Sequence, residues 1–197
     1  MFAYIFSFLV LLNPFALFIY LVPLYKEQGL GTFFKILAWA SLISFVIYGF
    51  FAVYGQNIFN VLQVNFEAFR IFGGIVLLSF ALVFILQGKK SFITTKGEIS
   101  SIASEIALPF IVGAGTITLS ILIGENFNDA TSILILFIIM VLNYIFVAVL
   151  MIIRDKVKNK YNKMFDNYAE ILLRLSGFIV GSYGVGLIIS GIENLID

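Results

Sequence analysis

Two polar interruptions lie inside otherwise apolar runs, and both are of a kind that binds small charged molecules through the backbone. The first is Asn13-Pro14, within the uncharged run from Met1 to Tyr25. Proline lacks an N–H and its ring clashes with the carbonyl four residues earlier, so a continuous helix through Pro14 is not expected. Asparagine before proline is typical of a helix start instead. The sequence therefore predicts two half-helices that meet within one apolar run.

The second interruption is rich in glycine and hydroxyl groups. Residues 112–118 read Val-Gly-Ala-Gly-Thr-Ile-Thr and lie in the middle of another apolar run. Gly113 and Gly115 leave little side-chain volume near the backbone, and Thr116 and Thr118 add hydroxyl groups. We predict a second broken helix here, with these four residues as candidate binding groups beside Asn13.

A helix that restarts after a break presents free N–H groups and the positive end of its dipole. Near Phe15 and Thr116 such ends would hold a carboxylate. The preceding half-helices end in carbonyls near Leu12 and Val112 that would accept from an ammonium group. A small zwitterionic substrate would satisfy both sets. Asn143, in the middle of a later run, either adds a contact to this site or forms a hydrogen bond between helices.

Composition sets the environment of these interruptions. The chain has 197 residues, 61% of them hydrophobic and 12% charged, with a mean hydropathy of +1.09. A soluble domain typically has about 25% charged residues, so we expect an integral membrane protein, all helix, in contact with the bilayer. Cysteine and histidine are absent, which excludes thiol redox chemistry and histidine proton relays. We expect no enzyme, cofactor, metal site or nucleic-acid partner.

Six apolar runs are long enough to span a membrane, and the segment Gln56–Phe69 is expected to lie along the interface. Ten of the twelve lysines and arginines fall in the loops after the first, third and fifth runs. The positive-inside rule makes those loops cytoplasmic and puts both termini outside, in a multi-pass protein of the cell (inner) membrane. The runs are Met1–Tyr25, Ile36–Tyr54, Ile71–Gly88, Ile106–Gly124, Thr131–Ile153 and Leu175–Ile192.

An internal repeat relates the two halves. Arg70 and Gly73 open the third run, and Arg174 and Gly177 open the sixth with the same offset of 104. A similar offset places the Asn13 break on Gly113. Because each half has three spans, the second must be inverted relative to the first, as in many secondary transporters, whose matched breaks lie near the bilayer midplane. The expected organisation is one membrane domain with repeats at 1–88 and 105–197 and a cytoplasmic loop at 89–104.

The arginines and glycines of the repeat have two interpretations, and both stay open. A cation in the first turn opposes the helix dipole, so each arginine needs a partner, and Glu67 is the expected partner of Arg70. The glycines Gly73 and Gly177 allow close helix packing. These four positions are therefore expected to have either a structural or a gating role.

Several of these motifs resemble the MarC family of integral membrane proteins. They are Asn13-Pro14, the element 68–74, Leu108-Pro109-Phe110 with Gly113 to Thr118, and the element 174–177. The resemblance implies six spans and a relation to small neutral amino acid transporters. Where the family usually has Gly-Pro-Gly-Ala-Ile, this chain has Gly-Ala-Gly-Thr-Ile, and Phe15-Ala16 replaces a glycine that usually follows Asn-Pro.

The expected function is therefore secondary transport of a small neutral amino acid such as glycine or alanine, by alternating access. The coupling ion, H⁺ or Na⁺, is left open, as is association with a second copy of the chain. One rival is a transporter or channel for ions or another small metabolite. The other rival is a membrane scaffold protein that transports nothing.

Overall fold

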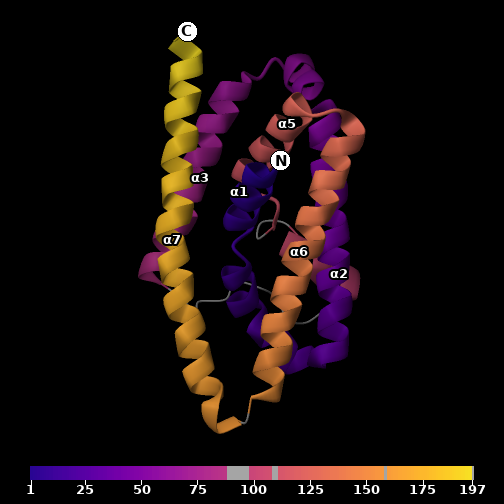
Figure 1. The fold of residues 1–197 in the computed structure, drawn as a ribbon, viewed down its shortest axis with the longest axis vertical. Coiled ribbons are helices and arrows are strands. Elements are labelled where there is room, and N and C mark those ends of the chain that lie inside the picture. The colour runs from indigo at the N-terminus through magenta and orange to yellow at the C-terminus, as the bar shows by residue number, and fades with distance from the viewer. Residues whose placement is uncertain (88–97, 108–110, 158, 197) are drawn as a thin grey trace.

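The computed structural model describes residues 1–87, 98–107, 111–157 and 159–196, and these are almost entirely helical (Figure 1). This confirms the prediction of an all-α protein. Lys89, Lys90, Lys96 and the motif residues 108–110 lie outside the described residues. The helices are α1 (Phe2–Leu12), α2 (Pro14–Leu62), α3 (Phe66–Leu86), α4 (Ile99–Ile106), α5 (Ala114–Asn126), α6 (Asp129–Lys156) and α7 (Asn159–Ile196).

By length and composition, four stretches of described helix are able to cross a membrane. The first of them, Phe2–Leu62, contains both α1 and α2 and thus the first two predicted spans. The predicted fourth span falls on α4, the undescribed residues 108–110 and α5, and neither helix alone is long enough. The structure therefore establishes a multi-pass helical membrane protein, while the count of six spans stays a prediction. The other three stretches are Phe66–Leu86, Asp129–Lys156 and Met164–Ile196.

Helix α2 is divided by Gly29, whose φ of 74° and ψ of 168° are not helical. Only glycine adopts this region readily, because it has no Cβ. The first part of α2 therefore runs from the Asn13 break to Gly29, and the second part forms a separate long segment. Gly29 thus separates the second half of the predicted first span from the predicted second span.

Helices take up parts of two predicted segments. In Gln56–Phe69, α2 continues to Leu62 and α3 begins at Phe66, so the segment is a connection between two helices, and its location at the membrane interface stays a prediction. The Asn65 side chain makes this sharp restart favourable, since it accepts from the backbone N–H groups of Glu67 (2.7 Å) and Ala68 (3.2 Å). In the predicted loop 89–104, helix α4 already begins at Ile99.

The α1 region is enclosed by the longer helices. Figure 1 shows α1 between α3 and α7 on one side and α2 and α6 on the other. Phe8 of α1 and Phe18 and Leu21 of α2 are fully buried. Large apolar side chains on the outer faces are exposed instead, for example Phe137 (53%) and Phe178 (61%). An apolar exterior around a packed core is what a lipid environment requires.

Helices α3 and α7 form the most extensive pair in the molecule. Their backbones come together at Gly74 and Gly184: a Cβ on Gly184 would lie 2.8 Å from the Gly74 carbonyl oxygen. Such close approach is the usual way in which membrane helices gain packing energy, because lipid provides no hydrophobic drive for association. The α3–α7 pair is therefore a frame against which the other helices are placed.

Two glycines of α7 provide a matched test of this frame. Gly184→Ala is expected to lower the free energy of unfolding by about 1–3 kcal/mol, because the methyl group cannot fit against Gly74. Gly186→Ala, two residues away, meets nothing within 4 Å and is expected to leave stability unchanged or to raise it by up to about 1 kcal/mol. Thermal unfolding in detergent measures both. Equal stability of the two variants would contradict the close contact.

Candidate functional site

Asn13 forms the first break. Its φ of 45° and ψ of 73° are left-handed, a conformation that asparagine tolerates better than most residues. The side chain is 3% exposed. Its Oδ1 accepts from the Ala16 N–H at 3.2 Å, which caps α2, and its Nδ2 donates to the Ser176 Oγ of α7 at 2.8 Å. Asn13 thus ends α1, starts α2 and ties the break to α7.

Thr116 organises the second break. Gly113 is extended (φ −124°, ψ 168°) and has no side chain with which to cap α5. The Thr116 Oγ1 accepts from the Gly113 N–H at 2.9 Å and lies 2.9 Å and 3.2 Å from the carbonyl oxygens of Gly113 and Ile111. A hydroxyl group has a single hydrogen, so the two carbonyls are alternative acceptors. Gly113 thus leaves the first N–H groups of α5 without the side-chain cap that Asn13 gives to α2.

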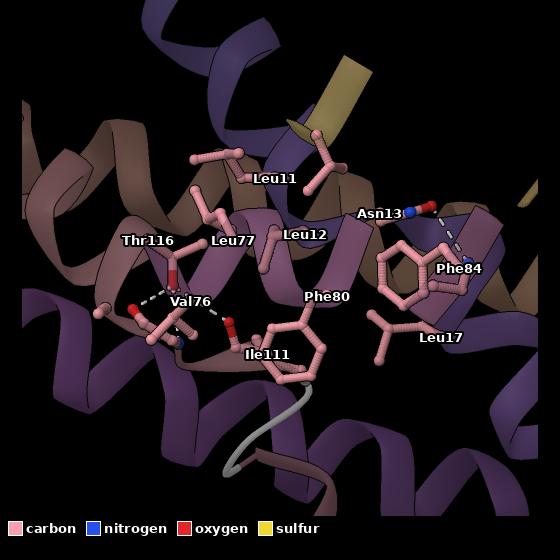
Figure 2. A pocket seen from close by; sticks show the side chains of 14 residues that line it. Leu11, Leu12, Asn13, Leu17, Val76, Leu77, Phe80, Phe84, Ile111 and Thr116 are labelled. Carbon is pink, nitrogen blue, oxygen red and sulfur yellow. Dashed lines mark hydrogen bonds between the residues drawn. The ribbon is translucent and has the colours of Figure 1, made fainter. Parts of the chain in front are cut away.

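A cavity of about 50 Å³ lies between the two breaks. Figure 2 shows Asn13 and Thr116 toward opposite ends of it, with Leu12 and Leu77 between them. A water molecule needs roughly 10–15 Å³ of such space, so the cavity has room for about three to five waters. Its walls come from the first break (Leu11, Leu12, Asn13, Ala16, Leu17), the second break (Ile111, Gly113, Ala114, Thr116), α3 (Val76, Leu77, Phe80, Phe84) and α7 (Val180).

Of the predicted binding residues, Asn13, Gly113 and Thr116 line this cavity. Pro14 and Phe15 instead line, with Asn13, an apolar groove of about 530 Å³ between the first break, α6 and α7. Asn13 therefore borders both spaces.

The other predicted binding residues do not line the cavity. Gly115 packs against the Leu77 side chain, leaving no space for a Cβ. The Thr118 hydroxyl donates to the Ala114 carbonyl within α5, at 2.9 Å. Asn143 is fully buried on α6, and neither atom of its side-chain amide has a hydrogen-bond partner among the described residues. An unpaired buried amide is costly, so Asn143 is the most anomalous polar group near the site.

The two arginines pair with neighbouring carboxylates. Arg70 lies 3.3 Å from Glu67, as the sequence predicts. Arg174 lies 3.0 Å from Glu170 and also donates to the Ile85 carbonyl of α3 at 2.7 Å. The glycines beside them make close contacts: a Cβ on Gly73 would lie 3.1 Å from the Ala114 carbonyl carbon, and one on Gly177 would lie 2.9 Å from the Ile85 side chain. Arg174, Gly73 and Gly177 thus contact a neighbouring helix, whereas the Arg70–Glu67 pair lies within α3. A structural or a gating role for the four positions stays a prediction.

Sequence reasoning missed two partners of the breaks. The Tyr48 hydroxyl on α2 is fully buried and donates to the Ile111 carbonyl at 2.6 Å. This carbonyl, beside the expected position at Val112, is therefore already hydrogen-bonded within the protein. Ser176 was missed too. The signal for Tyr48 was present, because Ser41, Ser44 and Tyr48 follow one another at helical spacing on one face of an apolar run.

These features define a multi-pass helical membrane protein in which helix ends at Asn13 and Gly113 border a small cavity. The chain belongs to the MarC family: the model for "MarC family integral membrane protein" matches residues 1–196. It is similar to a "UPF0056 membrane protein" from Aquifex aeolicus (strain VF5), with 24% identity over 200 residues that cover 96% of this chain and 91% of that relative. No solved structure matches.

The hydroxyl of Thr116 is expected to stabilise the second break. Thr116→Val removes the partner of the half-buried Gly113 N–H and is expected to cost about 1–3 kcal/mol of unfolding free energy. Thr118→Val is the control, since among the described residues the Thr118 hydroxyl bonds to a carbonyl of its own helix, and its loss is expected to cost less than about 1 kcal/mol. Thermal unfolding in detergent compares them; the reverse order would contradict this role.

Proposed function

We propose that this protein is a secondary transporter of small neutral amino acids such as glycine or alanine. The observation that carries the proposal is the cavity of about 50 Å³ lined by both helix breaks. In transporters with discontinuous helices, the substrate lies where the broken ends meet. The proposal includes six spans in two inverted repeats, with the breaks in the first and fourth spans near the bilayer midplane.

The polar groups of the cavity suit a zwitterion. The α5 N-terminus, with no side-chain cap at Gly113, offers N–H groups and the positive end of the helix dipole to a carboxylate. The Asn13 amide and the Thr116 hydroxyl are the polar side chains among the described residues of the lining, none of which is charged. A net-neutral substrate avoids the cost of burying an unpaired charge there. The small volume and the large apolar side chains around it favour a short substrate side chain.

Contacts between the breaks and the frame support the inverted repeat. The first break reaches α7 through the Asn13–Ser176 hydrogen bond. The second break reaches α3, where Ala114 packs on Gly73. Each break thus contacts the third long helix of the opposite half, and Ser176 and Gly73 lie at nearly equivalent positions of the repeat. A two-fold relation between the two halves would produce this pattern, in which each break contacts a helix of the other half.

The membrane orientation is part of the proposal. The basic residues that flank Gly29 in α2 (Lys26 and Lys35) and those in the last turn of α6 (Arg154 and Lys156) favour a cytoplasmic location for the α6–α7 connection, which places both termini outside in the inner membrane. The described residues of the cavity lining provide no carboxylate for a proton route, so Na⁺ and H⁺ are to be distinguished by imposed gradients. An ion pathway or a scaffold role would be recognised by the outcomes below.

The test is flux of radiolabelled glycine and alanine in liposomes. Gly113→Ala adds a methyl group that meets nothing within 4 Å, at a residue that lines the cavity. It is expected to fold normally and to reduce flux by about tenfold or more, which corresponds to about 1.4 kcal/mol. Gly113 is a cleaner probe than Gly115, where a Cβ would clash with Leu77.

Gly186→Ala is the matched control, because it makes the same chemical change in open space on α7. Wild-type flux in Gly113→Ala would place the substrate elsewhere. Ion flux that is independent of amino acids would favour the channel or metabolite transporter, and no flux under any gradient would favour the scaffold.

A further inference from the structure

Two side-chain hydrogen bonds join helices at opposite ends of the molecule. At one end the Tyr25 hydroxyl of α2 donates to the Asp155 carboxylate of α6. At the other end the Gln56 amide of α2 donates to the Glu125 carboxylate of α5 at 2.6 Å. We call these the Tyr25–Asp155 latch and the Gln56–Glu125 latch. Neither takes part in the cavity or in the α3–α7 frame.

The distance between the two latches along α6 is large enough to span the hydrocarbon core of a membrane. Glu125 lies just before the start of α6 at Asp129, and Asp155 lies near its end at Lys156. An α-helix rises about 1.5 Å per residue, so the two carboxylates are separated by about 40 Å along α6. The hydrocarbon core of a bilayer is about 30 Å thick. One latch therefore lies at each membrane surface in the proposed arrangement.

The two latches occupy equivalent positions in the two halves. Tyr25 and Glu125 each lie 11 residues after the first residue of a helix that begins at a break, Pro14 or Ala114. Asp155 lies 26 residues after Asp129, the start of α6, and Gln56 lies 26 residues after Leu30, which follows the Gly29 break. The offsets are thus 100 and 99. Each latch closes the far end of a restarted helix onto the second long helix of the other half.

We propose that the Tyr25–Asp155 and Gln56–Glu125 latches are the two gates of this protein, and that access to the central cavity from each side requires one latch to open. This inference rests on the proposed function, because gates presuppose alternating access. Both latches are formed in this structure. Because they join the restarted helices rather than the α3–α7 frame, opening one leaves the frame intact.

The two gates are not equally strong. At the Tyr25–Asp155 end, the Arg154 guanidinium lies over the Tyr25 ring, 5.7 Å from its centroid. Arg154 is 4% exposed and bonds to both carboxylate oxygens of Asp166 on α7, at 2.8 Å and 3.0 Å. A partly buried bidentate pair of this kind is among the stronger polar contacts in proteins. Asp155, Gln56 and Glu125 are all exposed, so the Arg154 contact is the reason to expect that the Gln56–Glu125 gate opens more readily.

The absence of cysteine from the natural chain makes a direct accessibility test available. Val180 lines the cavity and is 1% exposed, and Val180→Cys adds no bulk there. The probe is a small, charged methanethiosulfonate reagent added to one side of oriented liposomes. Protease cleavage of a C-terminal tag gives the orientation. The measured quantity is the rate of thiol modification from each side.

Each latch variant is expected to raise the rate of thiol modification from one side of the membrane, and the two variants are expected to do so from opposite sides. Tyr25→Phe keeps the ring and removes the hydroxyl, and it is expected to raise the rate about two- to tenfold from the side of the α6–α7 connection only. Gln56→Leu is expected to raise it to a similar degree from the other side only. Tyr54→Phe, at an exposed tyrosine of α2, is the control and leaves both rates unchanged. Asp155→Leu and Glu125→Leu remove the partners of Tyr25 and Gln56. They replace Tyr25→Phe or Gln56→Leu if one of these folds poorly, and each is expected to give the same effect as the variant that it replaces.

Each outcome supports or overturns the gates. No change in either rate, or a rise from the same side in both latch variants, overturns them. An unreactive thiol in the Val180→Cys protein that also carries Tyr25→Phe and Gln56→Leu overturns them too. Glycine flux is measured on the same vesicles. If the two latch variants raise the modification rate from opposite sides but the vesicles show no glycine flux, the gates are supported and the amino acid substrate is excluded. If glycine flux is present but the modification rates show no difference between the two sides, the proposed function is supported and the gates are excluded.

Discussion

An apolar interior leaves no solvent partner for the backbone at a helix break, and this constraint governs the whole structure. Each break must satisfy its own N–H and carbonyl groups from within the protein. Asn13 does so with one side chain that caps α2 and reaches Ser176. The second break uses the Thr116 hydroxyl together with Tyr48, which donates to the Ile111 carbonyl from another helix. The cavity lies between two breaks whose polar groups are hydrogen-bonded within the protein.

The need for fixed partners explains why the frame is built from glycine. Ser176 and Gly73, the contacts of the two breaks, lie on α7 and α3. If these two helices shifted, both breaks would lose their positions together. The Gly74–Gly184 approach holds the helices in contact over their backbones, and Arg174 adds a bond to the Ile85 carbonyl. In the proposed mechanism this helix pair is the static part of the molecule, and the latched helices around it are the movable part.

The sequence predicted those features whose cause is local. Asn13-Pro14 and Gly113 specify breaks through the chemistry of two or three neighbouring residues, and Glu67 is found from Arg70 by helical spacing. Partners that the tertiary structure brings together were missed: Ser176 lies 163 positions from Asn13 and Tyr48 lies 63 from Ile111. Composition sets Gln56–Phe69 apart as a separate mixed segment, whereas in the structure it consists of the end of α2, a short turn and the start of α3. Both interpretations of Asn143 stay open, because its side chain is buried and has no hydrogen-bond partner among the described residues.

The two breaks are related by position but differ in chemistry, and this difference bears on how a substrate would lie between them. At the first break a side-chain oxygen already accepts from the Ala16 N–H, so the helix end offers less to an anion. At the second break the cap residue is glycine, and Thr116 is engaged with the Gly113 N–H rather than with the first turn of α5. The positive dipole end of α5 is therefore the better carboxylate site. A zwitterion in the proposed site would lie with its carboxylate toward α5 and its ammonium toward Asn13. Two halves related by an inverted repeat can therefore bind opposite ends of an asymmetric substrate.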